Sequence, residues 1–156
     1  MANYNFILPV DDGIRISSVY GIRIDPTTGF GITIHNGLDF ACPIGSNVYA
    51  AAIGKVIWEG KNKSYGNAVI IEHDEGFLTL YAHLQNSDVK SGDYVFQGQT
   101  IAYSGLTGHS TGPHLHFETI DGNITLGNKP IKDIIKEKNA IIDEEGYKHT
   151  GILGAT

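Results

Sequence analysis

The stretch His109-Ser110-Thr111-Gly112-Pro113-His114-Leu115-His116-Phe117-Glu118 decides how this chain is organised. Pro113 restricts the backbone and ends the loop before it. Polar and apolar residues then alternate, with His114, His116 and Glu118 on one side of an extended chain and Leu115, Phe117 and Thr119 on the other. This period is typical of a half-buried strand. Two neighbouring histidines on the polar face pack poorly, which favours cation binding or proton transfer.

The composition limits the class of protein. The chain has 156 residues, which suits one domain over residues 1–156 better than two. Apolar residues make up 41% and charged residues 18%, as in soluble globular proteins. The chain has 20 glycines and only 5 prolines, which favours a β-rich fold with many tight turns.

Charge and cysteine content exclude several kinds of partner and site. The net charge is −6 and no basic run stands out, so we expect no nucleic-acid partner. No apolar stretch is long enough to span a bilayer, so we expect no membrane insertion. The lone cysteine, Cys42, excludes an internal disulfide and a cysteine-rich zinc site, and we interpret it as a small core residue.

Short strands separated by turns account for most of the chain. Strand patterns cover residues 14–23, 35–41, 48–52, 54–58, 67–73 and 77–84, and a strand–turn–strand unit covers 89–101. Only Ile131 to Lys138 looks helical, as a short surface helix after Pro130. Residues 139–156 form a tail of unknown role. We therefore predict an all-β domain with a single antiparallel sheet that is apolar below and polar above.

Two further strands place polar side chains opposite an apolar face. In 35–41, His35 and Asp39 share one face, and Leu38 and Phe40 share the other. In 77–84 the apolar face consists of Leu78, Leu80, Ala82 and Leu84, and the polar face of Thr79, Tyr81 and His83. His83 is therefore predicted to face the groove together with Tyr81.

These residues are suited to metal chemistry. His35, Asp39 and one histidine of the His114/His116 pair give the three nitrogen and oxygen ligands that are common at catalytic zinc. A water in the open fourth position becomes a nucleophile near neutral pH. The histidines left over, His83 and the other of the pair, are then free to transfer protons or to stabilise the oxyanion.

Other polar residues have weaker claims. We interpret His73, at the end of a strand, as structural. Tyr20, Arg23 and His109 are candidates for lining the groove, with ordinary packing or solvent exposure as the alternative.

An ordered set of motifs in the chain resembles the motifs of a known family. The motifs are S-S-V-Y-G-I-R, H-N-G-L-D-F-A, G-N-A-V-I-I-E-H, L-Y-A-H-L, V-K-S-G-D-Y-V-F-Q-G-Q-T-I and T-G-H-S-T-G-P-H-L-H-F-E, from about Ser17 to Thr119. Together they resemble the lysostaphin-type zinc metallopeptidases, peptidase family M23. The resemblance implies a compact antiparallel β domain with a groove across its main sheet. It also implies hydrolysis of peptide bonds in the stems or cross-links of bacterial peptidoglycan.

The resemblance also implies a role for each site residue. His35, Asp39 and His116 correspond to the ligands of one Zn²⁺ ion, and His114 and His83 to the two non-ligand histidines that assist the attack of water. We expect one of these two to accept a proton and the other to donate a hydrogen bond to the oxyanion. The bond that is cut, a glycine bridge or a D-Ala–diaminopimelate cross-link, stays open.

Two features depart from the family pattern. The segment after Thr119 does not match the usual ending, and Met1 to Leu8 lack the pattern of a secretory signal. We therefore expect a monomeric, phage-encoded lytic enzyme of the endolysin or tail-component kind, with antimicrobial action. It would reside in the virion or the host cytoplasm before it reaches the bacterial cell wall.

Two alternatives to a zinc endopeptidase stay open. A non-catalytic peptidoglycan-binding or activator module on the same fold predicts lost ligand positions, and all five are present. A biotinyl- or lipoyl-carrier domain is suggested by V-K-S-G-D-Y-V-F-Q-G-Q, residues 89–99, but no lysine lies in a suitable motif at a hairpin tip.

Overall fold

The computed structural model describes residues 6–18, 21–24, 32–35, 37–108, 110, 112–123, 125–126 and 128–138. The strands are β1 (Ile16–Ser18), β2 (Gly21–Ile24), β3 (Ile32–His35), β4 (Leu38–Phe40), β5 (Asn47–Tyr49), β6 (Gly54–Asn62), β7 (Gly66–Glu72), β8 (Phe77–Ser87), β9 (Tyr94–Val95), β10 (Thr100–Ser104), β11 (Leu115–Asp121), β12 (Thr125–Leu126) and β13 (Lys129–Pro130). Helix α1 (Ile131–Lys138) is the one α-helix in this part of the chain and has the predicted bounds. The predicted all-β fold is confirmed. No described helix is long and apolar enough to cross a membrane.

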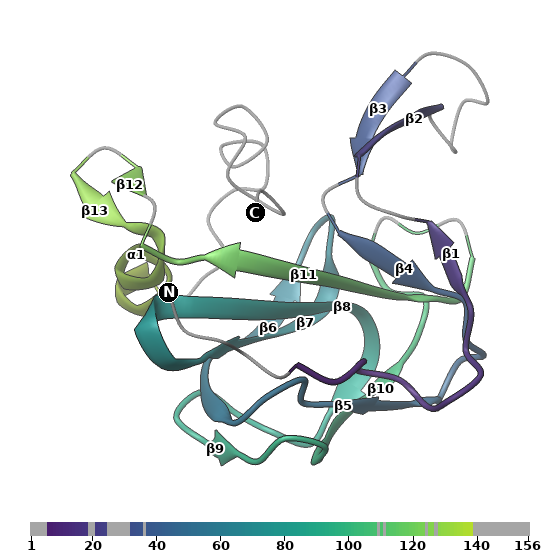
Figure 1. Ribbon diagram of the computed structural model, residues 1–156, viewed down its shortest axis with the longest axis horizontal. Helices are drawn as coiled ribbons and strands as arrows, with labels where there is room; N and C mark the ends of the chain where they lie inside the picture. The colour runs from purple at the N-terminus through teal and green to yellow at the C-terminus, as the bar shows by residue number, and fades with distance from the viewer. Residues whose placement is uncertain are drawn as a thin grey trace.

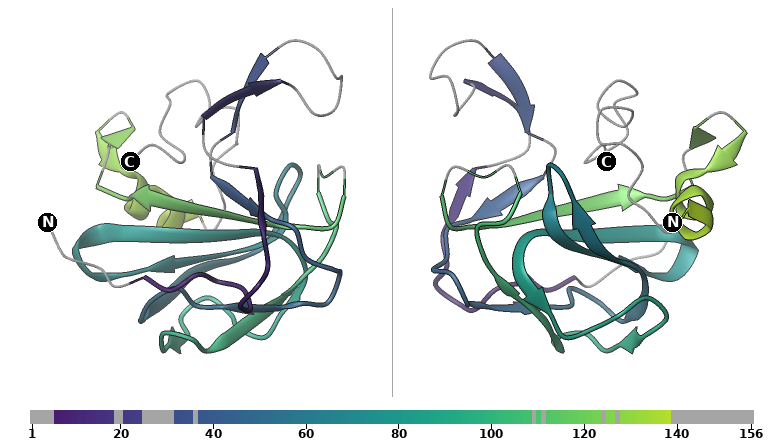
Figure 2. Two further views of the ribbon diagram at one scale, coloured as in Figure 1. Left: turned by 45° about the vertical axis from the view of Figure 1, so that its right-hand side comes forward. Right: turned by 180° about the vertical axis from the view of Figure 1, so that it is seen from behind.

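A nine-stranded sheet forms the body of the molecule (Figure 1). Its strand order is β1-β4-β11-β8-β7-β6-β9, and β10 joins it by pairing with both β8 and β5. All these pairs are antiparallel. The hairpins β2–β3 and β12–β13 form two small separate sheets, which rise on the same side of the main sheet at opposite ends (Figure 2).

The strand predicted over residues 35–41 is two strands in the structure. β3 ends at His35 and pairs with β2, whereas β4 begins at Leu38 and pairs with β1 and β11. Gly37, between them, is buried against the backbone of β11. A Cβ atom there would overlap the Phe117 carbonyl oxygen and come within 2.8 Å of Glu118 Cγ. Glycine is therefore the residue that lets the chain pass so close to β11 where it changes sheet.

Both faces of the main sheet carry an apolar core, which corrects the predicted apolar-below, polar-above arrangement. One core includes Phe40, Leu115 and Phe117, together with side chains from β5 and β10. The other includes Leu80, Trp58 and Ile120 and is closed by Ile135 of α1, which is only 1% exposed. Polar residues thus occupy only part of the second face, because α1 and its neighbours bury the rest.

The predicted faces of β8 are also corrected. Tyr81 and Thr79 are fully buried, and Tyr81 belongs to the core opposite His116. Ala82 pairs directly with His116 and therefore lies on its face of the sheet. Strict alternation would then send His83 to the Tyr81 side. However, His83 has a left-handed backbone (φ 60°), and its side chain lies on the same side as that of Ala82. A β-bulge, rather than alternation, brings His83 to the site.

His73 and Cys42 are both buried, and Cys42 belongs to the core that contains Phe40. Their burial supports the interpretation of both as structural residues. His73 Nδ1–H donates to the Ile53 carbonyl at 2.7 Å, and Nε2 lies 2.8 Å from Thr79 Oγ1. Thr79 Oγ1 lies 2.9 Å from the Tyr81 hydroxyl, which accepts the Ala51 amide at 3.0 Å. Only a neutral His73 ring gives every polar atom in this series of hydrogen bonds a partner, because Thr79 then donates to Nε2 and Tyr81 donates to Thr79.

This network predicts that His73 makes a pH-dependent contribution to the free energy of unfolding. Burial lowers the pKa of His73 below its usual 6.5, despite the hydrogen bond to Ile53 that raises it. Above pH 6.5 both the folded and the unfolded chain carry a neutral ring. Below pH 6.5 the unfolded chain binds a proton before the folded chain does. The stabilising contribution of His73 is therefore lost as pH falls toward the folded-state pKa. We expect wild type to lose up to about 1.4 kcal/mol per pH unit through this group.

The measurement is denaturant unfolding of wild type and His73→Gln between pH 7.5 and 5.5. Because the variant lacks the titrating ring, the difference in their free energies of unfolding should shrink as pH falls. A difference that stays constant over this range would contradict the assignment.

Candidate active site

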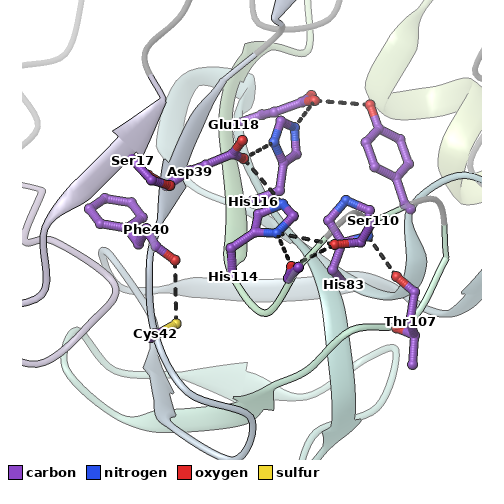
Figure 3. A network of polar contacts seen from close by, with 12 residues as sticks. Ser17, Asp39, Phe40, Cys42, His83, Thr107, Ser110, His114, His116 and Glu118 are labelled. Carbon is purple, nitrogen blue, oxygen red and sulfur yellow. Dashed lines mark hydrogen bonds and ion pairs between the residues drawn. The ribbon is translucent and has the colours of Figure 1, made fainter. Parts of the chain in front are cut away.

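Strand β11 places two site residues next to each other on one face. His116 pairs with Asp39 of β4 on one side and with Ala82 of β8 on the other, and Glu118 pairs with Leu80. Directly opposite residues in antiparallel strands share a face, so the side chains of His116, Asp39 and Glu118 converge (Figure 3). The alternation predicted for this stretch is confirmed. All three residues are less than 10% exposed.

The imidazole of His116 lies between two carboxylates. Its Nδ1 is 2.8 Å from Asp39 Oδ1 and its Nε2 is 2.7 Å from Glu118 Oε1. Burial lowers the pKa of His116, but the hydrogen bonds and charges of Asp39 and Glu118 outweigh it and raise the pKa to about 9. A positive charge among them stabilises two carboxylates so close to one ring. A proton on the ring or a metal cation between Nδ1 and Asp39 supplies this charge.

Glu118 and Tyr65 form the outer part of this arrangement. The Tyr65 hydroxyl donates to Glu118 Oε1 at 3.0 Å, and its ring stacks on that of His116 with centroids 6.0 Å apart. Glu118 is 1% exposed, and its other oxygen, Oε2, is buried without a hydrogen-bond partner among the described residues. A carboxylate at this position holds the Nε2–H of a ligand histidine and leaves Nδ1 free to bind a metal. Alternation along residues 114–118 predicts the correct face for Glu118 but no role for it, and no sequence pattern indicates Tyr65.

His83 and His114 lie beside this pair, and each directs its Nδ1 at a backbone carbonyl. The Nδ1–H of His83 donates to the Thr107 carbonyl at 2.7 Å, and that of His114 donates to the Gly112 carbonyl at 2.7 Å. Ser110 Oγ lies 3.1 Å from His114 Nδ1 and donates to the same Gly112 carbonyl. Backbone carbonyls only accept, so the hydrogen-bond pattern assigns the proton of each neutral ring to Nδ1. Each Nε2 is then a lone-pair acceptor.

The distances place both rings at the His116–Asp39 pair. His114 Nε2 is 3.5 Å from Asp39 Oδ1. The His83 ring centroid lies 4.9 Å from that of His114 and 6.0 Å from that of His116. Burial lowers the pKa of His83 to about 4, with smaller contributions from the neighbouring histidines. His83 is therefore neutral near pH 7.

The donors that face each other fit a divalent cation. An imidazole nitrogen and a carboxylate oxygen are common ligands of zinc, and a carboxylate behind the imidazole supports binding. The third predicted ligand, His35, lies at the end of β3, and its side chain is outside the described residues. Within the described part of the chain, no three His, Cys, Asp or Glu side chains are arranged so that they could hold a metal ion.

The structure brings four of the five predicted residues together: Asp39, His83, His114 and His116. The three predicted groove-lining residues are not tested, because Tyr20 and His109 and the side chain of Arg23 lie outside the described residues. The assignment of ligand and proton-transfer roles stays a prediction.

The comparisons with known proteins agree on one family. Residues 33–129 match the model of Peptidase family M23. The peptidoglycan DD-endopeptidase ShyB of Vibrio cholerae is 47% identical over 125 residues, which is 79% of this chain and 28% of ShyB. The chain thus spans about a quarter of the length of the curated relatives it matches.

Solved structures support the same conclusion. A zinc-containing peptidase from Vibrio cholerae is 46% identical, with a TM-score of 0.66 over 72% of this chain and 35% of that chain. The catalytic domain of lysostaphin from Staphylococcus simulans is 34% identical, with a TM-score of 0.66 over 73% of this chain and 85% of that chain. None of these similarities bears on the expected phage origin, which stays a prediction. The matched family model, the close relatives and the shared β architecture establish that the chain belongs to peptidase family M23 and has the lysostaphin-type fold.

Proposed function

We propose that this protein is a zinc-dependent endopeptidase that hydrolyses cross-links in bacterial peptidoglycan. The observation that carries the proposal is the His116 ring held between Asp39 and Glu118 at 2.8 and 2.7 Å, with two further histidines at its edge. This arrangement supports metal binding because it supplies a nitrogen and an oxygen donor backed by a buried carboxylate. It argues against the activator module, which the sequence analysis linked to lost ligand positions.

His116 Nδ1 and Asp39 Oδ1 would hold the zinc ion, with His35 as the third ligand. When bound, zinc supplies a Lewis acid for the peptide carbonyl and lowers the pKa of a water molecule toward neutrality. Glu118 accepts the Nε2–H of His116 and fixes the orientation of the ring, so that Nδ1 would be the nitrogen that holds zinc once its proton is lost. Tyr65 donates to Glu118 and so holds that carboxylate in place.

His114 is the residue best placed to move a proton. Its Nε2 lies 3.5 Å from Asp39 Oδ1 and is unprotonated in the neutral ring, so it is able to accept a proton from the attacking water. Returned to the leaving amine, the same proton would complete hydrolysis. His83 presents its Nε2 in the same way. Because the Nδ1–H of each ring is bound to a carbonyl, neither neutral ring has a donor for the oxyanion. The hydrogen-bond pattern favours two acceptors, and the acceptor-plus-donor division expected from the sequence stays a prediction.

We propose that the substrate is a cross-link in which the peptide bond joins two centres of D configuration. Several relatives that cover two thirds or more of this chain are named peptidoglycan DD-endopeptidases, among them ShyB and ShyA at 47% and 45% identity. The match to lysostaphin, also 47% identical, extends over only 54% of the chain. The longer matches favour a D-Ala–diaminopimelate bond over a glycine bridge.

The ligand assignment predicts that some variants lose zinc, whereas another keeps zinc and loses only activity. Asp39→Ala and His116→Ala should lose most of their zinc, because each removes one of only three protein ligands. His114→Ala should keep zinc and lose activity by about two orders of magnitude or more, the usual scale for a general base. Elemental analysis and loss of turbidity of purified cell walls, with and without a chelator, measure the two effects.

The matched control is Asp74→Ala, which removes an exposed carboxylate on the turn before β8 and should change neither quantity. Full zinc occupancy in both Asp39→Ala and His116→Ala would show that the ligands are wrong. Zinc loss in His114→Ala with retention in His116→Ala would reverse the two roles.

The substrate assignment predicts a preference between defined muropeptides. A dimer joined through D-alanyl-diaminopimelate should be cleaved at least about tenfold faster than a dimer joined by a glycine bridge, because the groove must match the backbone of one of them. Mass spectrometry of the products identifies the bond. Faster cleavage of the glycine bridge would refute the DD assignment, and no cleavage of either by the zinc-loaded protein would refute the endopeptidase proposal.

A further inference from the structure

The bulge that carries His83 separates β8 from its neighbour β7. Val69 pairs with Tyr81 and Asn67 pairs with Leu84, so β8 has one residue more than β7 between these two pairs. His83 lies in this interval with φ at 60°, a backbone region that is unfavourable for a residue with a side chain. Contacts from elsewhere must therefore stabilise the bulge.

Those contacts come from Tyr65, whose carbonyl accepts the His83 amide at 2.7 Å, and from Thr107, in the loop between β10 and β11. The Thr107 hydroxyl accepts the Asn67 amide at 3.0 Å and donates to the Leu84 carbonyl at 2.6 Å. Asn67 and Leu84 face each other across the two strands, so this hydroxyl connects the strands where the bulge separates them. The carbonyl of the same residue accepts the Nδ1–H of His83 at 2.7 Å. Figure 3 shows this carbonyl aimed at the ring.

Glycines allow Thr107 to come this close. A Cβ at Gly66 would overlap the carbonyl carbon and hydroxyl oxygen of Thr107. A Cβ at Gly108 would overlap the Gly66 amide nitrogen and lie 2.6 Å from the Ser64 carbonyl oxygen. Both glycines have positive φ, 66° and 76°. The loop after β10 is therefore packed backbone against backbone on the turn between β6 and β7, which fixes Thr107 at the bulge.

We propose that Thr107 is a positioning residue for His83. Its hydroxyl holds the bulge open and its carbonyl orients the ring, so that Nε2 faces the His116–Asp39 pair. The inference rests on the proposed function in that it assigns His83 to that reaction. Without the hydroxyl, the Asn67 amide and the Leu84 carbonyl both lose this partner. The bulge then keeps only the hydrogen bond from the His83 amide to the Tyr65 carbonyl, and the His83 side chain is freer to turn toward the Tyr81 face that strand alternation favours.

The test compares Thr107→Val, which has nearly the same shape without the hydroxyl, with Thr107→Ser, which keeps it. We expect Thr107→Val to keep its zinc and its KM within about twofold and to lose kcat by about tenfold or more, since a misplaced proton-transfer group affects chemistry more than binding. Thr107→Ser should stay within about threefold of wild type in kcat. Thr100→Val, a half-buried threonine at the start of β10, is the matched control and should behave as wild type.

A second readout does not depend on activity. In ¹⁵N spectra of the histidine rings, wild type and Thr107→Ser should show His83 as a protonated Nδ1 with a free Nε2. Thr107→Val should show this pattern weakened or averaged. This distinguishes failure of the inference from failure of the proposed function, because the ring signals are informative even if no peptidoglycan is cleaved.

Two results would overturn the inference. One is a Thr107→Val protein with wild-type kcat and unchanged His83 signals. The other concerns wild type alone and applies even if the valine variant does not fold. The Thr107 hydroxyl proton, held by its hydrogen bond to the Leu84 carbonyl, should exchange slowly enough to show a nuclear Overhauser contact with the Asn67 amide proton, and absence of this contact would exclude the bridge.

Discussion

The site depends on a change of neighbour along one edge of β8. Up to Ala82 this edge pairs with β11, and from Leu84 onward it pairs with β10. His83 lies between the two pairings. The loop that joins β10 to β11 leaves and returns at the same gap, where Gly105 pairs with His114. Residues far apart in the sequence therefore meet at one opening in the sheet, which continuous pairing along β8 would have closed.

The charge balance at this opening follows from burial. Asp39, His116 and Glu118 are all nearly inaccessible to solvent, and buried ions are stable only when opposite charges compensate them. One imidazole between two carboxylates leaves an excess of negative charge unless a cation or protons are added. The same geometry that makes the folded apoprotein favour a proton on His116 therefore makes the site favour a divalent cation. Tyr65 and the nearby apolar core keep Glu118 out of solvent, so that its charge acts on the ring at low dielectric.

Several features could be predicted because they depend on neighbours in the sequence. The shared face of His114, His116 and Glu118 follows from the two-residue period after Pro113, and α1 begins directly after Pro130. The burial of Cys42 follows from its apolar surroundings. Each is set by the local pattern, whatever strands come to lie alongside.

The features that were missed depend on pairing between distant segments. The side chain of His83 reaches the site through a bulge, and nothing in residues 77–84 alone requires an extra residue there, since the groups that support it, the Tyr65 carbonyl and Thr107, lie outside this segment. Glu118 illustrates the same limit in another way. Alternation places it beside His116, but only the pairing of β11 with β8, the close approach of Gly37 and the Tyr65 hydroxyl turn it from a surface carboxylate into a buried partner of the ring. A residue of this kind has the same local pattern as a solvated glutamate, so its function becomes apparent only when the whole sheet is assembled.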